Sequence, residues 1–288
     1  MNRRSFIQKT LGSTVALHAF PYHLFASDTK KQAHDRVLLG PRKVEVSRLA
    51  QGSGTNGVGH ASNQTRQLGV HGLADLYRAC YANGVTFWDT ADQYGSHPHV
   101  REALKTVKRE NVAILTKTHA STEKEMWADL DRFRKELGTD YIDVLLLHCM
   151  MDADWDKTKA GAMHVIEEAQ AKGIVRTKGT SCHTLEALKT SAKAPWVEVD
   201  LARFNPAQAY MDSDPQTVYR VLKEMKAQGK GVIGMKILGQ GQLRRRADEA
   251  LEYALAHNDV IDCFTIGAEN RGEMEDLLRK IPAASVRA

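Results

Sequence analysis

The chain has 288 residues, of which 42% are hydrophobic and 26% are charged, and its formal net charge is +5. This composition is ordinary for a folded protein and excludes a disordered or collagen-like chain. The excess positive charge is dispersed among acidic residues, and the run Arg244 to Arg246 is typical of a solvated helix start. We therefore expect no nucleic-acid surface. The four cysteines form no CxxC pair, which argues against a disulfide framework or a zinc site.

The first 30 residues have the pattern of a targeting segment. Paired Arg3 and Arg4, then Phe6 and Ile7, precede a modestly apolar run over residues 10–26. This order resembles a twin-arginine export signal, and the alternative is a disordered basic leader. We expect the export machinery to take the folded protein to the periplasm, so a cofactor could travel inside it. Residues 1–30 are excluded from the fold, and no membrane span is expected after processing.

Beyond this segment, strand and helix patterns alternate. Residues 36–48 are typical of a hairpin that turns at Gly40 and Pro41. Eight apolar or β-branched runs follow, near residues 49–52, 85–91, 112–118, 143–149, 175–181, 199–204, 231–238 and 260–267. Helical patterns between them include residues 72–84, 122–138, 163–173, 215–229 and 247–258. This alternation predicts a single (β/α)8 TIM barrel with an N-terminal β-hairpin over residues 36–288. A doubly wound sheet is the alternative, but the GxGxxG turn that it would favour is absent.

Three predicted strands end in different ionisable residues. Asp89 ends the second, Lys117 the third and His148 the fourth, while Tyr94 follows Asp89 closely. Because the strand ends of such a barrel open onto one face, we expect these side chains to converge. An acid, an amine, an imidazole and a phenol in one cluster predict proton-transfer chemistry.

Six segments together resemble the aldo-keto reductase family over almost all of residues 36–288. They are GPRKVEVSRLAQGSGTNG, FWDTADQYGS, ILTKTH, YIDVLLLHC, AKGIVRTKGTSCHTLEAL and TIGAENRGEMEDLL. The resemblance implies a nicotinamide-dependent enzyme that interconverts a carbonyl compound and its alcohol. It also implies that Asp89, Tyr94, Lys117 and His148 form the catalytic tetrad.

The chemistry of hydride transfer accounts for these residue types. A carbonyl oxygen that gains negative charge needs a proton donor, and Tyr94 is the predicted one. We expect the Lys117 ammonium to lower the pKa of the phenol while Asp89 holds the lysine charged. A neutral His148 ring would hydrogen-bond the substrate oxygen.

The resemblance also implies a set of cofactor contacts. Ser181 matches the residue that binds the nicotinamide carboxamide, but Cys182 replaces the usual Asn beside it. Met235 stands where an aromatic ring would stack on the nicotinamide, and Lys236 is an expected phosphate neighbour. The remaining predicted cofactor residues are Leu238, Gly239, Gly241, Arg244, Gly267, Glu269 and Asn270.

The cofactor is predicted to be NAD or NADP, with NAD favoured. Glu269, and Glu273 after it, occupy positions where relatives that prefer NADP carry basic residues. A carboxylate repels the 2′-phosphate and can accept a hydrogen bond from a ribose hydroxyl. Arg271 is the residue that could offset part of this repulsion.

Histidines gather in the predicted strand-end loops, at positions 60, 97, 99, 119 and 183. We interpret them as loop residues that line a polar entrance, and we expect no metal. Two alternative functions stay open. One is an exported oxidoreductase that retains its cofactor and couples two substrates, and the other is a non-catalytic nucleotide-binding barrel.

Overall fold

The computed structural model describes residues 30–288. The predicted twin-arginine segment lies almost wholly outside these residues, so export and the periplasmic location stay predictions. Within the described part of the chain, none of the helices combines the length and apolar character that a membrane crossing requires.

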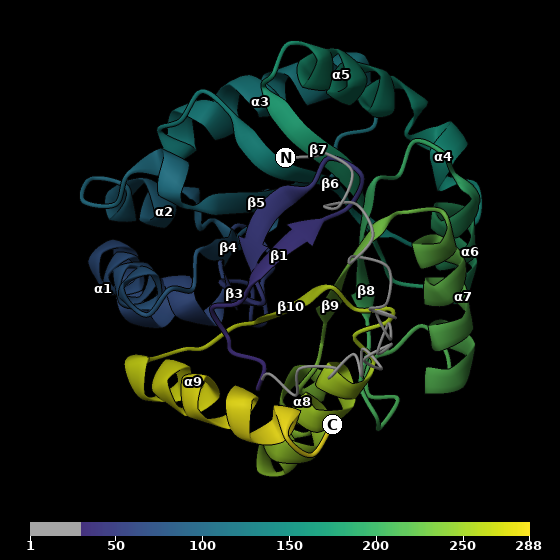
Figure 1. Cartoon of the computed structure of the whole chain (residues 1–288). Coiled ribbons are helices and arrows are strands. Elements are labelled where there is room, and N and C mark those ends of the chain that lie inside the picture. The colour runs from purple at the N-terminus through teal and green to yellow at the C-terminus, as the bar shows by residue number, and fades with distance from the viewer. Residues whose placement is uncertain (1–29) are drawn as a thin grey trace, which may run out of the picture.

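Eight parallel strands close into a barrel ringed by helices (Figure 1). The barrel strands are β3 (Leu49–Gly52), β4 (Phe87–Asp89), β5 (Ala113–Thr118), β6 (Ile142–Met150), β7 (Val175–Cys182), β8 (Val199–Arg203), β9 (Gly231–Met235) and β10 (Cys263–Ile266). Neighbours follow the chain order from β3 to β10, and β10 closes on β3. The predicted barrel is confirmed. Six predicted runs contain their strands, while β6 exceeds its run by one residue at each end and β7 by one residue at its end.

Helices follow the strands and cover the outside of the barrel. They are α1 (Asn63–Ala82), α2 (His97–Ala103), α3 (Glu123–Leu137), α4 (Trp155–Thr158), α5 (Ala160–Ala171), α6 (Leu185–Lys193), α7 (Pro215–Ala227), α8 (Ala247–Ala256) and α9 (Arg271–Ser285). Local chemistry sets their ends. In α3, a capping box joins Thr122 and Glu125 at the start, and left-handed Gly138 ends the helix with φ 68°.

The predicted hairpin forms from β1 (Arg36–Leu39) and β2 (Val44–Ser47). It crosses the barrel in Figure 1 at the end where the strands begin. A Cβ at Gly40 would lie 3.0 Å from the carbonyl oxygen of Glu198, which directly precedes β8. Because the hairpin covers this end, ligands must reach the barrel interior from the opposite end, where the strands stop.

Strand periodicity decides which side chains enter the barrel. Phe87, Leu115 and Leu146 belong to the interior cluster that the hairpin also joins. Trp88, Ile114 and Leu145 belong to the outer core beneath the helices. Since side chains alternate between faces, the next inward position on each strand is Asp89 on β4, Lys117 on β5 and His148 on β6. The apolar interior therefore ends in a polar layer at the open end.

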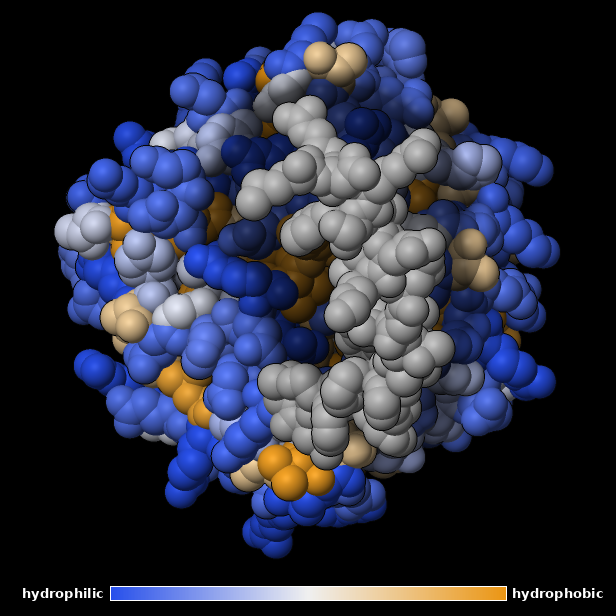
Figure 2. All heavy atoms as spheres, viewed as in Figure 1, coloured by the Kyte–Doolittle hydropathy of each residue, from blue (hydrophilic) through white to orange (hydrophobic). Residues whose placement is uncertain are grey.

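The hairpin end of the molecule is mainly hydrophilic. Figure 2 shows this face from the same side: hydrophilic residues make up most of the visible surface, and hydrophobic residues show at the bottom of a central hollow and in small patches around it.

Candidate active site

Asp89 and Lys117 form a buried ion pair at the centre of the polar layer. Lys117 is 1% exposed, and its ammonium donates to Asp89 Oδ1 and, over 2.9 Å, to the carbonyl oxygen of Thr90. The other carboxylate oxygen of Asp89 accepts a bond of 2.7 Å from the hydroxyl of Thr265. Both charged groups thus have fixed partners, which a charge removed from water requires.

Tyr94 ends the short 3-10 helix η1 (Asp92–Tyr94) that follows β4. Its ring lies between two glycines, because a Cβ at Gly54 or at Gly57 would come within 2.3 Å of ring carbons. The Lys117 ammonium lies 4.8 Å from the ring centroid. Within residues 30–288, the Tyr94 hydroxyl makes no hydrogen bond to protein, so it is free to bind a ligand.

The expected effect of Lys117 on the phenol is wrong in this structure. Burial, with further contributions from the Asp89 carboxylate and from Cys149, raises the pKa of Tyr94 well above its ordinary value. The physical reason is that the Lys117 ammonium donates to Asp89 and to the carbonyl oxygen of Thr90, while the Asp89 carboxylate opposes ionisation of the phenol. Tyr94 is therefore held as the neutral phenol, the form that can donate a proton.

His148 is a neutral imidazole beside this ring. It is 4% exposed, and its centroid lies 5.6 Å from that of Tyr94 with the planes at 84°. Burial, followed by the charge of Lys117, lowers the pKa of His148 well below its usual value. Its Nδ1 has no hydrogen-bond partner among the described residues. The next residue, Cys149, has φ 59° at a register shift between β6 and β7, and such bulges re-aim side chains near active sites.

The interpretation of all five histidines as loop residues is wrong for His97 and His99. Both belong to the first turn of α2 and are buried. The prediction missed this helix because its apolar positions are few and Pro98 interrupts them. By contrast, His183 lines the open end of the barrel, and His119 stacks on His148 with centroids 4.7 Å apart. His60 is exposed, and its Nδ1 lies 3.1 Å from the carbonyl oxygen of Asp92.

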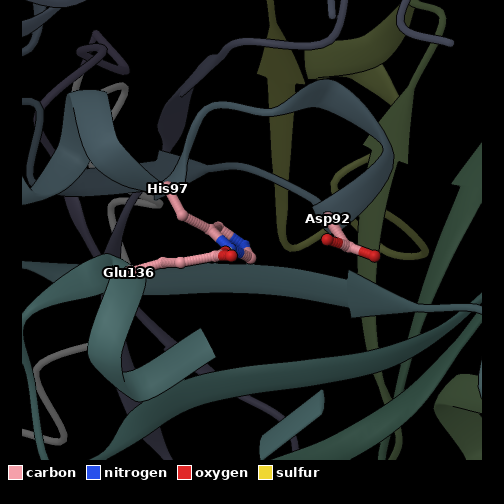
Figure 3. A group of neighbouring side chains, drawn as sticks. All are labelled: Asp92, His97 and Glu136. Carbon is pink, nitrogen blue, oxygen red and sulfur yellow. The ribbon is translucent and has the colours of Figure 1, made fainter. Parts of the chain in front are cut away.

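His97, Asp92 and Glu136 form a cluster whose donor atoms could suit a metal ion (Figure 3). The hydrogen bonds of this cluster show that its positive charge is the guanidinium of Arg132. Arg132 donates to Asp92 over 2.5 Å and to Glu136 over 3.3 Å. The two nitrogens of His97 meet Glu136 Oε2 at 2.8 Å and Thr116 Oγ1 at 2.7 Å. The guanidinium thus balances the carboxylates, and the network ties η1 to α3.

Two adjoining cavities open at the ends of the strands. The first, about 380 Å³, is lined by three residues of the predicted tetrad, Tyr94, Lys117 and His148, together with Cys149, Ser181 and His183 among others. The second, about 410 Å³, extends from Asp89 and Tyr94 toward Glu269 and Glu273. Both cavities include Tyr94, Met235 and Lys236 in their walls. The predicted catalytic residues therefore stand where the two spaces meet.

Most predicted cofactor residues line these cavities. Ser181 is in the wall of the first, Met235 and Lys236 are in both, and the second includes Leu238, Gly241, Arg244, Gly267 and Glu269. Two predicted residues do not line either one. Gly239 is buried with its α-carbon toward Ala209, and the Asn270 side chain caps α9 by accepting from the Glu273 amide.

The far end of the second cavity is acidic. Glu269 accepts a bond of 3.0 Å from Asn63, and Glu273 pairs with Arg244. The guanidinium that was predicted for a pyrophosphate therefore already has a carboxylate partner. Arg271 pairs with Glu275 at 3.0 Å and is absent from the residues that line this cavity.

Sequence reasoning missed the two glycines that contact the Tyr94 ring, Gly54 and Gly57, which we call the glycine seat. Gly54 and Gly57 belong to the segment GSGTNG, which contributed to the family resemblance only as a string. Three glycines in six residues were the available signal, since close approach of a side chain to the backbone is one use of glycine.

Comparison with known proteins agrees with this architecture. The profile of the aldo/keto reductase family matches residues 52–281. D-threo-aldose 1-dehydrogenase from Pseudomonas is 22% identical over 72% of this chain and 72% of its own length. The NAD/NADP-dependent indole-3-acetaldehyde reductase of Schizosaccharomyces pombe is 30% identical over 55% of this chain and 57% of its own. An aldo-keto reductase from Bacillus halodurans, solved in its holo form, superimposes with a TM-score of 0.68 at 19% identity, covering 86% of this chain and 91% of its own.

The family profile spans most of the chain, and the barrel carries the expected strand-end residues. The chain therefore belongs to the aldo/keto reductase family, a family of oxidoreductases that act on carbonyl compounds and alcohols.

The glycine seat generates a first prediction. Gly57→Ala should lower kcat on the order of 10²-fold, because its methyl group would displace the Tyr94 ring and small misplacements of reacting groups are costly. Gly59→Ala is the control for a methyl group in the same loop: a Cβ there meets nothing within 4 Å, and because φ 60° strains any residue with a Cβ, its loss is subtracted as the cost of that strain. Steady-state kinetics of both variants, with circular dichroism for folding, would test this. Equal losses in the two variants would remove the seat from the explanation.

Proposed function

We propose that this protein is a nicotinamide-dependent oxidoreductase that interconverts an aldehyde, ketone or sugar carbonyl and its alcohol. The observation that carries the proposal is the Tyr94 phenol, whose hydroxyl has no hydrogen-bond partner among residues 30–288, set over the buried Asp89–Lys117 pair where two cavities meet. Named relatives that act on aldoses and on indole-3-acetaldehyde support this range of carbonyl compounds.

The second cavity fits a nicotinamide dinucleotide in its chemistry. Its wall contains Gly267, where a Cβ would lie 2.7 Å from Thr55 Oγ1, so a residue with a side chain would disturb the wall. Ser181 Oγ accepts from the Cys149 amide over 2.9 Å, which leaves its proton free for a carboxamide oxygen. The nicotinamide ring, when bound, would supply or accept the hydride. In this proposal Ser181 and Met235 hold the nicotinamide end, and Leu238, Gly241 and Gly267 contact the remainder.

Tyr94 is the proposed proton donor to the substrate oxygen. Its raised pKa keeps the hydroxyl protonated, and the glycine seat fixes where that hydroxyl points. In this proposal Lys117, 4.8 Å from the ring centroid, holds the phenol ring in place by a cation–π contact, and Asp89 holds the ammonium. In the reverse reaction the same groups return the proton to the tyrosine.

His148 is proposed to orient the substrate. A neutral ring can donate a hydrogen bond to the carbonyl oxygen without competing for the proton that Tyr94 supplies. Stacking on His119 and the edge contact with Tyr94 fix the plane of the ring. The substrate oxygen would then lie between the phenol and the imidazole.

We further propose that the cofactor is NAD. Glu269 and Glu273 line the far end of the second cavity, where a 2′-phosphate would meet two carboxylates. Arg244 is neutralised by Glu273, and Arg271 faces Glu275, so neither guanidinium is free for that phosphate.

Removal of the phenol hydroxyl tests the proton donor. Tyr94→Phe should lower kcat by about 10²- to 10⁴-fold, while the dissociation constant for the nucleotide changes little. Tyr219→Phe is the control, because Tyr219 is on α7 and its hydroxyl binds Asp259. Turnover of a set of aldehydes and nucleotide titration would give both quantities. Undiminished turnover in Tyr94→Phe would exclude this tyrosine from the mechanism.

The pKa shifts predict an asymmetric pH dependence. The raised pKa of Tyr94 leaves the phenol protonated, and the lowered pKa of His148 leaves the ring neutral, between about pH 6 and 9. We therefore expect kcat/KM for reduction to be flat across this range. Alcohol oxidation needs the phenolate, so its kcat/KM should rise with pH throughout. A break in the reduction profile near the ordinary histidine pKa would contradict the assignment of His148.

Cofactor choice gives the third prediction in this section. The wild-type enzyme should show a higher kcat/KM with NADH than with NADPH. Glu269→Gln should shift that ratio toward NADPH about tenfold, since one unit of charge repulsion is removed. Glu275→Gln, which alters only the outward pair with Arg271, is the matched control. A wild-type preference for NADPH would disprove the choice of NAD.

A further inference from the structure

Lys236 differs from the other cations at the open end of the barrel. It lines both cavities, and its ammonium donates over 2.7 Å to the amide oxygen of Gln240. Lys117 is paired with Asp89, and Arg203 with Asp212. Among residues 30–288, no carboxylate lies within ion-pair distance of the Lys236 ammonium. Its partner within this part of the chain is therefore neutral, and burial, followed by the nearby charge of Arg203, lowers the pKa of the Lys236 ammonium from its ordinary value.

The backbone is constrained to present this side chain. Lys236 has φ 57°, a left-handed conformation that is unfavourable for a residue with a Cβ. Its carbonyl oxygen accepts from the amide group of buried Asn205 at 3.1 Å and from the Gly239 amide at 2.8 Å. Asn205 also binds the 207–209 segment through its oxygen and nitrogen. Such strain, held by a buried side chain, is typical of functional positions.

The surroundings of Lys236 leave its charge uncompensated. His119, His148 and His183 all have lowered pKa values, with burial as the first cause in each, so they are neutral near pH 7. The charge of Lys236 itself contributes to the lowering at His148 and His183. The nearest carboxylates of the polar layer already bind Lys117 and Arg203. The first cavity thus has a net positive charge beside the proposed reaction centre.

We propose that Lys236 binds an anionic group of the substrate, so that the enzyme favours carbonyl compounds that also carry a carboxylate or a phosphate. This inference rests on the proposed function and names the substrate class for the same site. Desolvating the ammonium is costly, and an anion in the first cavity would offset that cost. The ammonium could instead meet the diphosphate of the cofactor, because it also borders the second cavity, so the test must separate these two sources of anionic oxygen.

The test compares two aldehydes of equal chain length, succinic semialdehyde and butanal. In the wild type, kcat/KM should be higher for the anionic aldehyde. Lys236→Met should lower the ratio of the two values about 10- to 100-fold, because a partly buried charge pair is lost. Methionine keeps an unbranched stem on the same strained backbone. Lys236→Arg should retain most of the preference, and Lys223→Met, at an exposed ion pair on α7, should leave it unchanged.

A second measurement does not require turnover. Succinate should raise the melting temperature of the enzyme loaded with NADH, relative to sodium chloride of equal ionic strength, in the wild type but not in Lys236→Met. If neither aldehyde reacts yet succinate still protects through Lys236, the anion site stands and the proposed function fails. Protection that persists in Lys236→Met would overturn the proposal. An equal loss for both aldehydes, together with weaker NADH binding, would also overturn it and assign Lys236 to the cofactor.

Discussion

The buried pair of Asp89 and Lys117 is the interaction on which the site depends. An ammonium that is 1% exposed is tolerable only because a carboxylate, the Thr90 carbonyl and, through Asp89, the Thr265 hydroxyl surround the pair with hydrogen bonds. These groups come from β4, β5 and β10, which only a closed barrel brings together. The Lys117 ammonium, which would take part in catalysis, therefore also depends on the closed barrel for its hydrogen-bond partners.

The same pair explains why the pKa of Tyr94 is raised, although a lysine beside a tyrosine is expected to lower it. A lysine near a tyrosine ordinarily stabilises phenolate. Here the Lys117 ammonium is paired with Asp89, and the negative charge of Asp89 opposes ionisation of Tyr94. The structure thus favours a protonated phenol at rest. Negative charge that develops on the substrate oxygen during hydride transfer would then draw the proton from Tyr94.

The barrel and three tetrad positions could be predicted because strand periodicity encodes both. Leu115 and Lys117 share one face of β5, so the run that marks the strand also marks its last inward residue. Contacts between segments that are distant in the chain produce no comparable pattern in the sequence. Nothing in the order of residues near His97 indicates that α2 buries it against Glu136, or that the glycines before α1 receive the Tyr94 ring.

The charges of the polar layer differ in their partners. Lys117 is neutralised by Asp89, whereas Lys236 follows the end of β9 and, among residues 30–288, its ammonium has Gln240 as its one hydrogen-bond partner. Gln240 in turn donates to Asn56 across the opening, at 3.4 Å, so a neutral amide stands where a counterion would be expected. A ligand anion that replaced this amide would exchange a bond to a neutral acceptor for an ion pair. The inner charges would thus serve the reaction, and the outer one would select what reaches it.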